Sequence, residues 1–177
     1  MQPRSHAHSG IVWSVARRQS TDEQWVLLSY RLPREPSTPR SSVWRRLKRL
    51  GVAQLADGLV ALPADPRTRE ALEWVADEVI EHGGQAMLWL GRPADRAGLD
   101  DIAGRMTAAV AAEYASVASE AEIAALAEPA TRRRAVARLT RELRRIAERD
   151  FFTAPEGENA RHAVAELAAT VSVAATR

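Results

Sequence analysis

Between residues 24 and 92 the spacing of apolar residues alternates between the period of a strand and the period of a helix, and this order restricts the possible folds more than any other feature. Short β-favouring runs predict strands at residues 25–30, 52–55, 59–62 and 85–90. Helical patterns cover residues 38–50 and a segment that opens at Asp65-Pro66. The middle two strands flank Asp57-Gly58, which favours a tight hairpin.

The order strand, helix, strand, strand, helix, strand predicts an α+β fold of the ferredoxin-like βαββαβ type, with both helices on one face of an antiparallel sheet. We expect helix 38–50 to begin with a hydroxyl cap at Ser37-Thr38 and to end at Gly51. The second helix is expected to bury a stripe made of Leu72, Val75, Val79 and Ile80. Four tryptophans are expected in the core or at its edge, namely Trp25, Trp44, Trp74 and Trp89.

Beyond this region the pattern is helical. A helix over residues 99–128 has apolar residues at spacings of three and four, and Pro129 ends it. A cap at Thr131 then predicts a second helix, which forms a hairpin with the first and packs on the sheet or on a second subunit. Residues 158–174 predict a last helix. The expected organisation is a flexible arm, a ferredoxin-like domain and a helical region, at residues 1–23, 24–92 and 98–177.

The composition argues against several classes of chemistry. The chain has no Cys, which excludes thiol nucleophiles, disulfides and zinc–cysteine sites. It lacks a Gly-rich dinucleotide fingerprint, and no catalytic residue or metal ligand set stands out, so we expect a protein without cofactor that binds rather than catalyses. No run approaches the ~20 apolar residues that cross a bilayer, so we expect no membrane contact and a cytoplasmic location.

The net charge of +2 conceals two basic clusters. Residues 31–49 carry seven basic side chains against one acid, and residues 132–149 carry eight against two. Arginines on one helix face neutralise phosphates and read guanine edges, so we nominate nine DNA-binding candidates. They are Arg40, Arg45, Arg46, Lys48, Arg49, Arg134, Arg138, Arg141 and Arg145. The alternatives are solvated helix faces, or ion pairs between the second cluster and the acids of helix 99–128.

A second candidate site surrounds the start of helix 38–50. Arginine side chains and helix N-terminal amides are the groups that bind a tetrahedral oxyanion such as chromate. The residues that would form such a site are Arg31, Arg34, Arg40, Ser37 and Thr38. The alternative is a basic helix start that holds no ligand.

The amino-acid sequence from Trp25 to Leu62 identifies a protein family more specifically than the predicted fold does. It resembles the N-terminal domain of the ChrB proteins in three short strings: Pro-Arg-Glu-Pro-Ser at residues 33–37, Val-Trp-Arg-Arg-Leu at 43–47, and Leu50-Gly51. The pair Glu113-Tyr114 and the string Arg-Asp-Phe-Phe at 149–152 also fit that domain, so the resemblance covers residues 24–153. More distantly, the region resembles the sheet domain shared by the phenylacetate repressors and the Cas2 proteins.

The resemblance implies a regulator that senses chromate and controls transcription, and we expect DNA as partner, chromate as effector and a homodimer. Full-length ChrB proteins carry a C-terminal domain beyond the matched region, and phenylacetate repressors carry a winged helix before the sheet; this chain is too short for either. A Cas2-like nuclease needs a carboxylate after the first strand, where this chain has Ser29-Tyr30-Arg31. The rival hypothesis is an accessory protein that does not bind DNA and instead binds the oxyanion or a protein partner.

Overall fold

The structure is a computed structural model that describes residues 24–175, and the predicted arm at residues 1–23 lies outside the described residues. In chain order the elements are β1 (Trp25–Arg31), α1 (Thr38–Leu50), β2 (Ala53–Ala56), β3 (Leu59–Pro63), α2 (Pro66–Glu81), β4 (Gln85–Gly91), α3 (Arg96–Ala125), α4 (Pro129–Ala147) and α5 (Glu156–Ala175). Most bounds lie within two residues of the predicted ones, and the main exception is α3, which starts and ends three residues earlier than expected.

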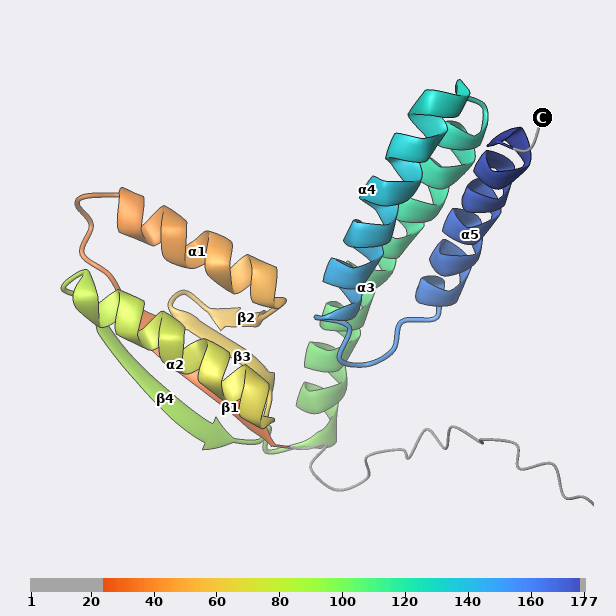
Figure 1. The fold of residues 1–177 in the computed structure, drawn as a ribbon. Coiled ribbons are helices and arrows are strands. Elements are labelled where there is room, and N and C mark those ends of the chain that lie inside the picture. Colours follow the sequence, from red (N-terminus) through yellow and green to blue (C-terminus); the bar gives the residue numbers. More distant parts are fainter. Residues whose placement is uncertain (1–23, 176–177) are drawn as a thin grey trace, which may run out of the picture.

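The four strands form one antiparallel sheet in the order β2-β3-β1-β4, and α1 and α2 lie together on one face of it (Figure 1). The predicted α+β fold is confirmed, and the strand order is that of a βαββαβ unit. Each connection through a helix passes over one strand, so β1 and β2 lie parallel with β3 between them, and β3 and β4 lie parallel with β1 between them.

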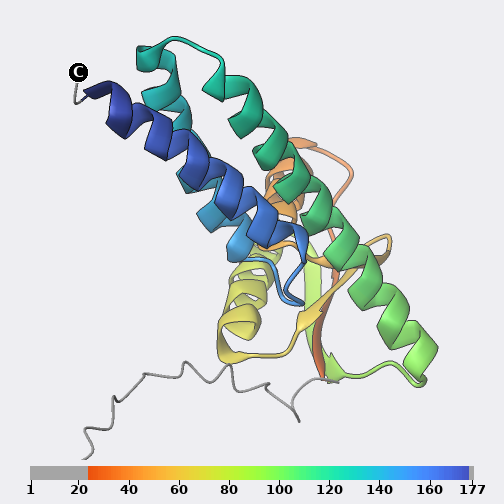
Figure 2. The same ribbon diagram turned by 90° about the vertical axis from the view of Figure 1, so that its right-hand side faces the viewer.

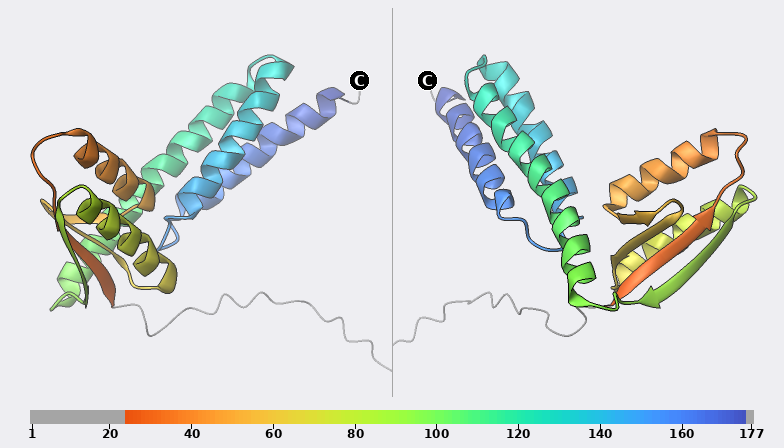
Figure 3. Two further views of the ribbon diagram at one scale, coloured as in Figure 1. Left: turned by 60° about the vertical axis from the view of Figure 1, so that its left-hand side comes forward. Right: turned by 180° about the vertical axis from the view of Figure 1, so that it is seen from behind.

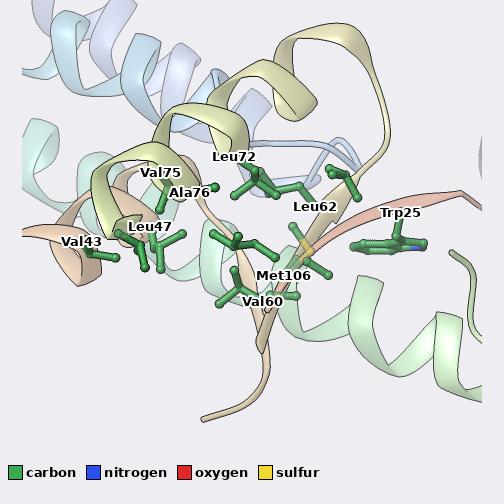
Figure 4. Packing of buried hydrophobic residues seen from close by; sticks show 14 residues of the cluster. Trp25, Val43, Leu47, Val60, Leu62, Leu72, Val75, Ala76 and Met106 are labelled. Carbon is green, nitrogen blue, oxygen red and sulfur yellow. The ribbon is translucent and has the colours of Figure 1, made fainter. Parts of the chain in front are cut away.

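The core of this domain lies between the sheet and the two helices (Figure 4). Leu28 of β1, Leu47 of α1 and Leu72 of α2 are fully buried there. Burial of one such side chain stabilises the fold by roughly 1.5–3 kcal/mol. Met106 of α3 also belongs to this cluster, so the first half of α3 packs on the sheet domain.

The second half of α3 forms a three-helix bundle with α4 and α5, around Tyr114, Leu139 and Leu167. The predicted hairpin and last helix therefore belong to one core. α3 has 30 residues and a length of roughly 45 Å, which lets one helix serve both cores. Figures 2 and 3 show the bundle projecting from one end of the sheet domain.

A short segment after α4 joins the bundle to the sheet domain. The side chain of Arg149 packs against Gly51, the residue that ends α1. Arg67 of α2 donates a hydrogen bond of 3.0 Å to the carbonyl of Glu148, and its guanidinium lies over the Phe151 ring. The ring of Phe152 lies 6.2 Å from that of Trp25, centroid to centroid. We call residues 149–152 the joint.

One predicted helix cap and one predicted helix start are wrong, since α1 starts at Thr38 as expected but has no hydroxyl cap. Ser37 precedes α1 in a helical conformation (φ −76°, ψ −18°), and its side chain caps no amide. An N-cap side chain reaches the next turn from an extended conformation, which Ser37 does not adopt. Thr131 lies within α4, which begins at Pro129. Proline fits the first turn of a helix because no N–H is needed there, so Pro129 starts α4 instead of only ending α3.

Three side chains expected in or near the core are exposed: Ile80, Trp74 and Trp89, at 56%, 62% and 55%. Trp74 lies two residues from the buried Leu72, which places it across the helix from the core. In β4 the neighbours Ala86 and Leu88 pack on the core, so the alternation of the strand directs Trp89 to the sheet face that α1 and α2 leave uncovered.

The cap of α2 is a testable contrast to that of α1. The Asp65 carboxylate accepts a 2.7 Å hydrogen bond from the Thr68 amide, and the Thr68 hydroxyl accepts one of 3.0 Å from the Asp65 amide. We predict that Asp65→Ala lowers the free energy of unfolding by about 1–2 kcal/mol, whereas Ser37→Ala changes it by less than about 0.5 kcal/mol. Urea denaturation of both variants measures this, and equal losses would contradict the assignment of the caps.

The joint is tested at two glycines with nearly the same backbone angle. Gly51 and Gly83 have φ of 72° and 73°, so alanine is strained at both. A Cβ at Gly51 would lie 2.7 Å from Cβ of Arg149, whereas one at Gly83 has no neighbour within 4 Å. We predict that Gly83→Ala costs about 1 kcal/mol and that Gly51→Ala costs at least about 1 kcal/mol more, measured by urea denaturation. Equal costs would show that Arg149 does not press on α1.

Candidate nucleic-acid interface

One stripe of arginines runs along the exposed face of α4. Spacings of four, three and four residues place Arg134, Arg138, Arg141 and Arg145 on the same side of the helix, and all four are exposed. The buried side of α4 contains Ala135, Leu139 and Ile146. The amphipathic pattern thus fixes the direction of the stripe, because burial of one face turns the other toward solvent.

Within the stripe the arginines differ in their partners. Arg138 forms an ion pair of 2.7 Å with Glu120 of α3, and Arg145 forms one of 3.4 Å with Glu142. Arg134 and Arg141 have no ion pair to any described residue. The predicted alternative, in which acids of α3 occupy the basic cluster, therefore holds for Arg138, and two arginines remain available to an external anion.

The basic residues of α1 divide into separate groups. Arg45 and Arg49, four residues apart, are exposed on one side of the helix. Arg46 is held by Glu78 of α2 at 2.9 Å, and the ammonium of Lys48 lies 5.4 Å from the ring centroid of Trp44. Arg45 and Arg49 are therefore more available to an external phosphate than Arg46 and Lys48.

Arg40, nominated for both sites, lies apart from Arg45 and Arg49. It lines a cavity of about 500 Å³ at the end of β1. The full lining is Tyr30, Arg31, Leu32, Arg40, Trp44, Asp57 and Gly58. Arg40 and Trp44 are four residues apart on α1, so they share a side that faces the sheet. The structure thus separates Arg40 from the outward basic face.

Of the oxyanion candidates, the structure brings together Arg31 and Arg40 around this cavity. Arg34, Ser37 and Thr38 are exposed and lie outside its lining. The Asp57 carboxylate opposes an anion here, since it lines the same cavity. Burial and then the charge of Asp57 raise the pKa of the Tyr30 hydroxyl, so Tyr30 stays a neutral donor at physiological pH.

The joint brings the two basic helices together. Arg149 lies just beyond the end of α4, is largely shielded from solvent, and donates a hydrogen bond of 2.9 Å to the carbonyl of Arg145. Its side chain reaches Gly51, directly after Arg49 and Leu50 of α1. Figure 1 shows α1 and α4 as the two arms of a V that meet at this point. The stripe of α4 therefore ends where the basic end of α1 begins.

Two adjacent side chains of α3 hold Arg149 and the next residue, Asp150, in place. Glu113 of α3 forms an ion pair with Arg149, and the Tyr114 hydroxyl donates a 3.4 Å hydrogen bond to Asp150. Asp150 in turn accepts from the amide of Ala154, ahead of α5. Burial and then the charge of Asp150 raise the pKa of Tyr114, so this hydroxyl stays protonated and donating.

Sequence reasoning missed Arg149, Glu113 and Gly51 as parts of the site. The family resemblance included both Glu113-Tyr114 and Arg149-Asp150, and the structure brings these two pairs into contact. The sequence alone did not show this contact. The register of the hairpin was needed to see it.

Two further searches of the described residues bear on the classes of function. No helix in this part of the chain is both long and apolar enough to cross a membrane. Nor do three or more His, Asp or Glu side chains gather there in a way that suits a metal ion.

Comparison with known proteins identifies the family of the chain. The family described as "Protein ChrB, N-terminal" matches residues 40–177, which include most of α1, the joint and the whole bundle. Protein ChrB of Cupriavidus metallidurans is 34% identical over 76 residues, which are 43% of this chain and 24% of that protein. The aligned part is thus about a quarter of the relative's length. No solved structure matches the chain. Since the family match covers most of the sequence, the chain belongs to the ChrB family.

Proposed function

We propose that this chain acts in chromate resistance as a DNA-binding regulator of transcription, that it works in the cytoplasm as a homodimer, and that chromate weakens its hold on DNA. Membership of the ChrB family supports the biological setting. The helices supply the chemistry for DNA binding, because an exposed row of arginines neutralises phosphates and releases counterions.

One observation supports the proposal most directly: the α4 stripe ends at Arg145, whose carbonyl accepts a hydrogen bond from Arg149, and Arg149 packs against Gly51 at the end of α1. Separate basic helices would each contact DNA weakly, since each presents only a few charges. Two helices held at a fixed angle contact one duplex together and lose no further freedom when the second one binds. The joint therefore favours a single continuous site.

The distribution of acids supports the same orientation. α2 presents an acidic outer face made by Glu70, Asp77 and Glu81, all exposed, while the nearby Glu73 is paired with Arg69 at 2.8 Å. This face repels phosphates, whereas α4 attracts them. A polyanion is therefore directed toward the arms of the V and away from α2.

The test uses fluorescence anisotropy with the DNA upstream of the protein's own gene, across a salt series. Arg134 and Arg141 have no ion pair with described residues, so the double variant Arg134→Ala/Arg141→Ala removes charge without breaking one. We predict roughly tenfold weaker binding and a salt slope reduced by about 2. The matched control Arg133→Ala/Arg144→Ala removes the same charge from α4 off the stripe, and we expect its slope to change by less than about 1.

Three results would count against this proposal. Equal losses in both double variants would mean that only net charge matters. Binding to random DNA as strong as to the upstream DNA would leave no basis for a regulator. Specific binding that chromate leaves unchanged would remove the effector from the proposal and leave DNA binding in place.

The cavity between Arg31 and Arg40 favours a second candidate, an accessory protein that binds the oxyanion and no DNA. Two guanidinium groups and the Tyr30 hydroxyl line the same space, which suits a tetrahedral dianion, and Asp57 opposes it. We predict that chromate binds the wild type with measurable heat in isothermal titration calorimetry. We further predict that Arg31→Ala and Arg40→Ala each weaken this binding by about tenfold or more, a loss of about 1.4 kcal/mol.

Arg34→Ala is the control for this titration, because Arg34 lies outside the lining of the cavity and is exposed. Equal effects of all three substitutions would indicate nonspecific attraction of chromate to positive charge. Chromate binding without any DNA binding would favour the accessory protein, and DNA binding without chromate binding would favour a regulator that answers to another signal.

A further inference from the structure

β4 is an edge strand, and no other described element packs against its outer side. It pairs with β1, and no other strand among the described residues pairs with its second side. An edge strand presents a row of main-chain donors and acceptors that another strand can take up. Soluble proteins block such rows with charged residues or proline, yet β4 has neither between Gln85 and Gly91.

The opposite edge of the same sheet is protected. β2 has four residues, and its register with β3 is broken between Gln54 and Ala56. α3 also packs against β2. A short, irregular and covered edge resists pairing, whereas the seven-residue, regular β4 invites it. The contrast within one sheet indicates that β4 has been left open to a partner.

The side chains of β4 add apolar surface to this edge. Met87, Trp89 and Leu90 are each more than half exposed. Met87 and Trp89 point to the sheet face that α1 and α2 leave uncovered, because Ala86 and Leu88 point into the core. Exposed apolar residues that gather on one strand mark an interaction surface more often than isolated ones do.

We propose that β4 is the interface with a second copy of this chain, in which the two β4 strands pair antiparallel about a two-fold axis at Leu88. Such pairing closes on itself and leaves no edge for a third copy. It sets Met87 of each copy against Trp89 of the other on the open face, a contact that sulfur and indole favour.

Charge also fits a second copy. The paired segments are uncharged in both copies. Antiparallel pairing about Leu88 therefore brings no like charges together along the length of the two strands. The inference does not depend on DNA binding, because every step rests on the sheet.

The first test measures the oligomeric state by sedimentation equilibrium. We expect the wild type to be a dimer. For Met87→Lys we expect the dissociation constant of the dimer to rise by about tenfold or more, since each dimer gains two charges in the interface. The matched control Leu126→Lys places the same charge at a residue that is 92% exposed in the turn between α3 and α4, and we expect it to dimerise like the wild type. Circular dichroism checks that both variants are folded.

The second test uses the absence of Cys. Across the proposed axis Leu88 faces its own copy at the Cα separation of about 4.5–5.5 Å that a disulfide spans. Mild oxidation should therefore link Leu88→Cys into a covalent dimer and leave Gln54→Cys, on the other edge, largely monomeric. A monomeric wild type, a dimer that tolerates Met87→Lys, or equal cross-linking of both variants would overturn the inference. A monomer that still binds DNA would remove the homodimer from the proposed function and leave its DNA-binding part in place.

Discussion

The arrangement of this protein depends on one arginine held between two parts of the chain. Arg149 forms an ion pair with Glu113 inside the bundle, and its side chain presses on Gly51 at the end of α1. Its guanidinium is largely shielded from solvent, with 15% of the side chain exposed, so this pair is screened less than the surface pairs of α3. Arg67 and the two phenylalanines of the joint add contacts around it. Without this packing, only α3 would tie the bundle to the sheet.

The acids of the bundle decide which arginines stay available. Glu113 and Glu120 each take one arginine, Arg149 and Arg138, and so hold the hairpin together. Arg134 and Arg141 lie on the same face of α4 without such a partner among the described residues. The same helix thus has structural and unengaged arginines side by side. This division explains how a chain of net charge +2 presents a basic surface.

The sequence predicts the fold well where local chemistry determines it. Asp65-Pro66 marks the start of α2 because aspartate caps and proline fits the first turn. It predicts less where tertiary contacts decide. Alternation shows that Met87 and Trp89 share a face of β4, but not that this face stays uncovered. The four-residue spacing of Arg40 and Trp44 already indicates that they share a side of α1. The prediction that Arg40 binds DNA did not take this into account. The ion pair of Glu113 and Arg149 required the register of the hairpin.

The central claim is that α1 and α4 contact one DNA duplex together. Backbone amide chemical shifts, recorded in a ¹⁵N-labelled sample as DNA is added, test it most directly because they report every surface at once. The account predicts that the largest shifts follow Arg45 and Arg49 of α1 and the α4 stripe through the joint, at the same DNA concentration, while α2 and α5 change little. Shifts confined to one of the two helices, or centred on α2, would contradict it.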